Sequence, residues 1–176
     1  MYTGQLKLFA HLGDKTLKSS RLFKWLGKKT DIYLRSVSLE LNKKNKSGET
    51  IFHILAEKKK TKYISYIINK CQNVNEPDNN GETPLHRAVK EGNIGTAQVL
   101  LEWGANVDYM TKNSETPLMY ACRFKQKFAM IQLLIKYGAN LEVINNEGES
   151  PLDICRNENA TPSIIKLVHP VHRQFI

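Results

Sequence analysis

The sequence repeats itself about every 33 residues. One set of aligned positions recurs at intervals of 33, 33 and 34 residues: Gly48, Gly81, Ser114 and Gly148. A second set recurs at the same intervals: Leu41, Val74, Val107 and Leu141. Units of this length cannot bury an apolar face alone and must stack on their neighbours. The period therefore predicts a solenoid whose core lies between successive units.

Each unit carries the signals of a helical hairpin. In the second unit, the Thr83 hydroxyl can cap a helix, and Pro84 suits its first position, where a missing N–H costs nothing. Gly92 ends this helix, and apolar residues then recur at helical spacing from Ile94 onward. Gly104 closes the second helix, where a left-handed residue is favoured. The pattern predicts two antiparallel helices, followed by an extended finger that leads into the next unit.

The stretch GETPLHRAVKEGNIGTAQVLLEWGANVD, residues 81–108, resembles an ankyrin repeat over its whole length. About four such units cover residues 45–168, with TIFH, TPLM and SPLD replacing TPLH in the first, third and last units. In the last unit, Thr161-Pro162 interrupts a shortened second helix. The resemblance implies an all-α ankyrin-repeat solenoid of paired antiparallel helices with β-hairpin-like fingers. It also implies a protein-binding module without enzymatic activity.

Charge is unevenly distributed along the chain. The net charge is +9, and residues 1–46 hold eleven Lys and Arg against three Asp and Glu. Residues 81–176 hold ten of each. We interpret residues 1–44 as a basic helical N-terminal cap or degenerate repeat, residues 45–168 as the repeat domain and residues 169–176 as a C-terminal tail. An alternative function follows, in which the basic segment binds nucleic acid or another acidic surface.

The polar side chains do not form a recognisable catalytic or metal site. There is no phosphate-binding loop, metalloprotease motif or nucleophile elbow, so we expect neither catalysis nor a cofactor or metal. The resemblance gives His53 and His86 a structural role, as hydrogen-bond partners of loop backbone. The run from Lys58 to Lys62 resembles a nuclear-localisation signal but also fits a solvated turn.

Cysteine usage and hydropathy bear on where the chain resides. Three cysteines without a CxxC pair predict neither a disulfide framework nor a zinc site, and Cys122 and Cys155 are expected to pack as small buried side chains. A reducing compartment is then the default. No stretch reaches the roughly 18 apolar residues of a membrane helix. We therefore expect no membrane insertion and a cytoplasmic or nuclear location.

Partner binding is expected at positions that vary between ankyrin repeats, namely finger tips, first-helix ends and the residue before the closing glycine. Large aromatic residues and arginine dominate interface energies, so Trp103 and Tyr137 are of particular interest. An alternative is that these two side chains only pack against neighbouring helices of the stack. The full predicted set is Asn79, Asn80, Lys90, Trp103, Met110, Lys112, Asn113, Arg123, Phe124, Tyr137 and Ile144. Small ankyrin proteins that mask Rel-type transcription factors are similar in repeat type and size.

Overall fold

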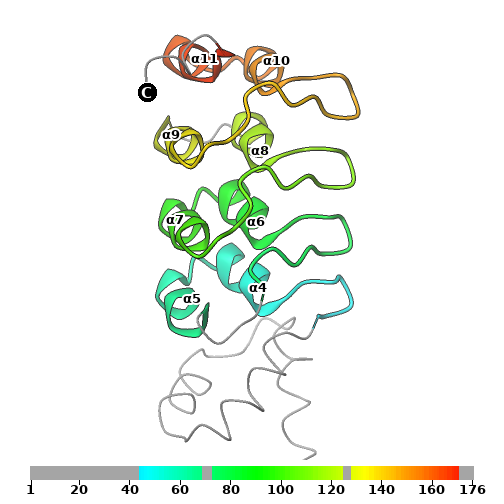
Figure 1. Cartoon of the computed structure of the whole chain (residues 1–176), viewed down its shortest axis with the longest axis vertical. Coiled ribbons are helices and arrows are strands. Elements are labelled where there is room, and N and C mark those ends of the chain that lie inside the picture. The colour runs from blue at the N-terminus through cyan, green and yellow to red at the C-terminus, as the bar shows by residue number, and fades with distance from the viewer. Residues whose placement is uncertain (1–43, 69–72, 125–127, 171–176) are drawn as a thin grey trace, which may run out of the picture.

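The computed structural model describes residues 44–68, 73–124 and 128–170. Within these ranges the secondary structure is eight helices and no strand. The first helices of the four units are α4 (Ile51–Glu57), α6 (Pro84–Lys90), α8 (Pro117–Arg123) and α10 (Pro151–Asn157). The second helices are α5 (Thr61–Ile67), α7 (Ile94–Glu102), α9 (Phe128–Lys136) and α11 (Pro162–Val168). Figure 1 shows them as two parallel columns, with the fingers projecting beyond the first helices.

Each first helix begins at a hydroxyl residue in extended backbone. Thr83 has φ −89° and ψ 167° and is followed by Pro84 at the first helical position. Thr50, Thr116 and Ser150 have nearly the same backbone angles. Because the cap acts locally, a Thr or Ser at this position starts the first helix in the same place in every unit, and in the last three units a proline follows it.

The core lies between the two columns of helices. Leu85 and Leu118 from first helices and Leu100 and Leu134 from second helices are almost completely buried. Full burial of such a side chain stabilises the fold by about 1.5–3 kcal/mol. Since α6 contacts α4 and α8, and α7 contacts α5 and α9, the stack stabilises units that could not fold alone. The predicted all-α solenoid is confirmed.

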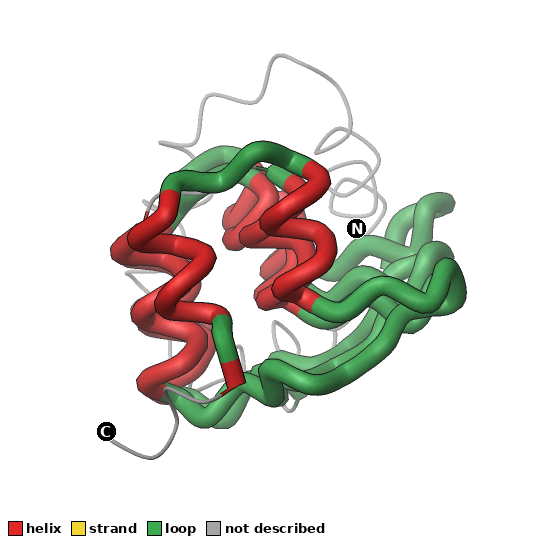
Figure 2. The backbone as a smooth tube through the Cα atoms, turned by 90° about the horizontal axis from the view of Figure 1, so that it is seen from above, coloured by secondary structure: helices red, strands yellow, loops and turns green. Residues whose placement is uncertain are grey.

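The fingers are joined by one backbone hydrogen bond between each successive pair. The amide of Asn79 donates to Ser47, that of Lys112 to Asn80, and that of Asn146 to Asn113, with N–O distances of 3.0–3.1 Å. These bonds involve equivalent positions, so the fingers stack in register. Viewed along the stack in Figure 2, they form a single projecting layer on one side of the helices.

Two details differ from the sequence interpretation. Thr161 is the N-cap of α11 and Pro162 its first residue, so this pair begins the final helix and does not interrupt it. Cys122 and Cys155 are buried in first helices as expected, but the expectation of no disulfide was wrong, because the two form one between α8 and α10, with Cα atoms 5.0 Å apart. Disulfides persist mainly in oxidising compartments. Cysteine usage therefore no longer supports a reducing compartment.

Candidate protein-binding surface

A glutamate precedes the first-helix cap in every unit. These residues are Glu49, Glu82, Glu115 and Glu149. They lie at the base of the fingers, and each makes hydrogen bonds or ion pairs with at least one side chain of its own or an adjacent unit. We call this row the glutamate ladder. It places carboxylates at regular intervals along the side of the stack formed by fingers and first helices.

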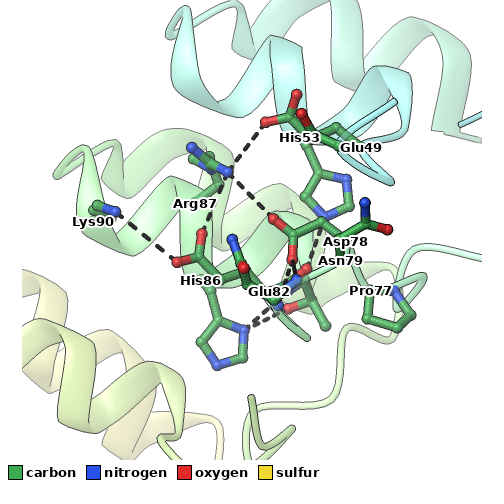
Figure 3. A network of polar contacts seen from close by, with 12 residues as sticks. Glu49, His53, Pro77, Asp78, Asn79, Glu82, His86, Arg87 and Lys90 are labelled. Atoms are coloured by element: carbon green, nitrogen blue, oxygen red, sulfur yellow. Dashed lines mark hydrogen bonds and ion pairs between the residues drawn. The ribbon is translucent and has the colours of Figure 1, made fainter. Parts of the chain in front are cut away.

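Arg87 forms ion pairs with the first two glutamates of the ladder. Its guanidinium lies 3.1 Å from Glu49, 3.4 Å from Asp78 and 3.3 Å from Glu82. Figure 3 shows these three carboxylates converging on Arg87 from two units, with Lys90 approaching Glu82 from the other side. The Lys90–Glu82 separation is 3.9 Å. Arg87 therefore links the first two units through a half-buried ion-pair network.

Tyr120, from the third unit, contacts the ladder glutamate of the second unit. Its hydroxyl donates a 2.8 Å hydrogen bond to the buried Glu82 carboxylate. Burial is the main cause that raises the pKa of Tyr120, and the Glu82 hydrogen bond raises it further, so the phenol stays protonated. The Tyr120 ring also contacts His86 and Phe124, with centroid distances of 5.1 and 5.4 Å. This side chain thus connects the second and third units.

Arg123 occupies the corresponding central place between the third and fourth units. Its guanidinium lies 2.6 Å from Glu115, 3.1 Å from Glu149 and 4.0 Å from Glu147. A hydrogen bond from Asn145 lowers the pKa of Glu149, and the Arg123 hydrogen bond and charge lower it further. One guanidinium therefore faces three carboxylates.

A polar cavity opens beside Arg123, between the third and fourth fingers. Its volume is about 360 Å³. The residues that line it are Asn113, Glu115, Arg123, Asn145, Asn146 and Glu147. Asn145 and Asn146 also hold the finger, since the Asn145 side chain accepts the amides of Glu147 and Glu149 and the Asn146 side chain donates to the Lys112 carbonyl.

The two predicted structural histidines bridge neighbouring units. His53 Nδ1 accepts the Thr50 amide at 3.1 Å, and its Nε2 lies 2.9 Å from the Glu82 carbonyl oxygen. His86 makes the equivalent contacts one unit later. Burial lowers the pKa of both imidazoles. Neutral histidines that brace the fingers agree with the structural role expected from the sequence.

Two family models describe the chain as ankyrin repeats, one matching residues 18–111 with three copies and the other residues 104–155 with many copies. The chain belongs to the ankyrin repeat family. This is a family of non-enzymatic protein–protein interaction modules. None of the curated proteins compared with the chain matches it.

The ankyrin fingers and first-helix ends hold nine of the eleven residues predicted to bind a partner. Asn79, Asn80, Lys112 and Asn113 are exposed at the finger tips. Lys90 lies 5.1 Å from the Phe124 ring centroid, and Arg123 lines the cavity with Asn113. We define the finger face as these nine residues: Asn79, Asn80, Lys90, Met110, Lys112, Asn113, Arg123, Phe124 and Ile144.

The two remaining residues lie elsewhere on the ankyrin stack. Trp103 caps the end of α7 and is 51% exposed, while the equivalent Tyr137 is half-buried and packs against the core. The first and second helices of a unit are antiparallel. The C-terminus of α6 therefore lies at the turn that joins the two helices, and the C-terminus of α7 lies at the opposite end of the hairpin. The structure does not bring Trp103 and Tyr137 together with the first-helix ends of the finger face.

Sequence reasoning missed three features of this surface: the glutamate ladder, the cavity and the Cys122–Cys155 disulfide. The recurring glutamate before the cap was a signal for the first of these. Over the described parts of the chain, no three His, Cys, Asp or Glu side chains gather where a metal could bind. No described helix has the length and hydropathy of a membrane span. The predicted basic cap lies almost wholly outside the described residues.

Proposed function

We propose that this ankyrin stack binds a partner protein through the finger face. The observation that carries the proposal is the exposure of large apolar side chains there. Ile144 is 60% exposed, Met110 48% and Phe124 40%. Exposed apolar groups gathered on one surface are typical of protein-binding sites.

The spacing of these residues supports a continuous surface. Met110 and Ile144 are 34 residues apart and occupy equivalent positions in adjacent fingers. The Asn146–Asn113 backbone hydrogen bond holds these two fingers in register. A partner meets side chains whose backbone is already ordered, so little conformational entropy is lost on binding. Regulation or inhibition of signalling or transcription is one use of such binding, and the likeness to Rel-masking proteins rests only on repeat type and size.

Quantitative capture from a cell lysate tests the proposal. Met110→Ser with Ile144→Ser alters the finger face, and Trp103→Ser serves as a matched exposed apolar control on the second-helix side. We expect the double variant to lose captured proteins that wild type and the Trp103 variant retain. Loss confined to the Trp103 variant would move the binding site to the second-helix ends.

The alternative function is binding of nucleic acid by residues 1–46. The concentration of eleven basic residues there favours it. Of these, Lys44 makes a 2.8 Å ion pair with Glu76 and donates to the Pro77 carbonyl, so one positive charge already has an anionic partner. Binding of a DNA or RNA oligonucleotide that weakens with salt and disappears on deletion of residues 1–43 would support this alternative.

A further inference from the structure

The charge of the finger and first-helix segments is opposite in sign to that of the whole chain. Residues 44–57, 73–90, 106–123 and 140–157 hold seven Lys and Arg against eleven Asp and Glu. The last two of these segments, from the third and fourth repeats, hold three against six. The whole chain has a net charge of +9. The finger side of the stack is therefore acidic, most strongly over the third and fourth repeats.

Glu147 makes this end of the face different from the rest. Asn80 and Asn113 occupy the same finger-tip position in the second and third units, so the fourth finger replaces an amide with a carboxylate. The Glu147 side chain is 74% exposed and lies 4.0 Å from Arg123, which has closer contacts with Glu115 and Glu149. Its negative charge is thus only weakly compensated within the protein.

Apolar side chains lie on the same two fingers as this charge. Ile144 is three residues before Glu147, and Met110 is three residues before Asn113. The cavity between the fingers, about 360 Å³, is at the small end of the roughly 300–1,000 Å³ range of ligand pockets. It is large enough for one long side chain but not for a folded element.

We propose that the fingers and first helices of the third and fourth repeats bind a basic, partly apolar segment of the partner protein. An arginine or lysine of the segment enters the cavity beside Glu147, and apolar residues next to it cover Met110 and Ile144. The carboxylate excess selects a cation and repels phosphates and acidic peptides. This inference rests on the proposed function and adds the chemistry of the partner.

Fluorescence anisotropy with three labelled peptides tests the inference on the full chain. The peptides share the same leucine residues and carry arginine, glutamine or glutamate at the intervening positions. At low salt we expect the arginine peptide to bind roughly two- to fivefold more tightly than the glutamine peptide, which corresponds to one favourable exposed ion pair. We expect added salt to reduce this difference and the glutamate peptide to bind most weakly.

Matched variants locate the contact. Glu147→Gln should weaken arginine-peptide binding roughly two- to fivefold and leave glutamine-peptide binding unchanged. Met110→Ser with Ile144→Ser should weaken both peptides. Glu102→Gln removes an exposed carboxylate from α7 and should change neither affinity.

Three outcomes overturn the inference: no binding of the arginine peptide, equal or tighter binding of the glutamate peptide, and equal weakening of arginine and glutamine peptides by Glu147→Gln. If the double variant at Met110 and Ile144 still loses captured proteins from the lysate, the proposed function survives these outcomes. If lysate capture is also unaffected, both fail together.

Discussion

His86 joins two repeats: its Nε2 lies 3.2 Å from the backbone carbonyl oxygen of Glu115 in the following unit. Its Nδ1 accepts the Thr83 amide at 3.1 Å. A neutral imidazole satisfies both bonds, with Nδ1 as acceptor and Nε2–H as donor. Burial lowers the pKa of His86 to about 4, so protonation of this imidazole destabilises the folded state relative to the unfolded state.

Stability should fall as the pH is lowered from 7 to 5. The unfolded state binds a proton below pH about 6.5 while folded His86 stays neutral, so the free energy of unfolding decreases by up to about 1.4 kcal/mol per pH unit. His53, whose pKa is also lowered, acts in the same direction. Urea denaturation at pH 7, 6 and 5 measures the slope. His86→Met, which copies Met119 of the third repeat, should reduce it, and an unchanged slope would contradict the assignment.

Two glycines at finger turns should respond differently to alanine. Gly81 has φ +80° and Gly148 φ +79°, so each substitution costs about 1 kcal/mol for the left-handed backbone. A Cβ at Gly81 would also lie 2.8 Å from the Lys112 amide nitrogen of the next finger, whereas a Cβ at Gly148 meets nothing within 4 Å. Gly81→Ala should therefore be the more destabilising variant in urea denaturation. Equal losses of unfolding free energy in the two variants would mean that the neighbouring finger can move away from a Cβ at position 81 with little loss of stability.

Tyr120→Phe should destabilise the stack by about 1–3 kcal/mol, because it removes a hydrogen bond from the buried Glu82 carboxylate. Tyr137→Phe removes a hydroxyl from a half-buried ring and should change stability little. Urea denaturation of both variants at pH 7 makes the comparison. If the two variants are equally stable, the Tyr120–Glu82 bond contributes nothing.

Reduction of the Cys122–Cys155 disulfide should loosen the fourth repeat. A cross-link that encloses about 33 residues stabilises by roughly 3–4 kcal/mol in the chain-entropy model. Hydrogen exchange of α10 and α11 should accelerate after reduction, and a variant with alanine at both positions should not respond to the reductant. Denatured, unreduced protein should have two fewer reactive thiols than reduced protein. Equal thiol counts would show that the bond is absent.

The fold followed from the sequence because its signals are local. Thr83, Pro84 and Gly104 mark where helices begin and end. The period repeats the hydroxyl cap in every unit, the proline at 117 and 151, and the closing glycine at 138. Buried residues such as Leu85 and Leu100 then follow from helical spacing. Prediction of the all-α stack therefore needed only short-range patterns.

The surface depended on contacts between units, which the pattern does not contain. Arg123 meets Glu149 because the fingers stack in register, and its alignment with Lys90 did not indicate that contact. Cys122 lies six residues after the N-cap of α8, whereas Cys155 lies five residues after the N-cap of α10. The two cysteines are therefore not at equivalent positions of the repeat, and the alignment of the units did not indicate that they pair. Trp103 and Tyr137 share a position, but their different burial depends on the packing of neighbouring side chains.

Site-specific photo-cross-linking tests the central claim, that the finger face binds a partner protein. A photoreactive phenylalanine analogue replaces Ile144 on the fourth finger or the exposed Gln132 on α9, and each variant is irradiated in cell lysate. We predict protein adducts from position 144 that excess unlabelled wild-type chain suppresses, and none from position 132. Adducts only from position 132, or adducts from position 144 that the wild-type chain does not suppress, would contradict the account.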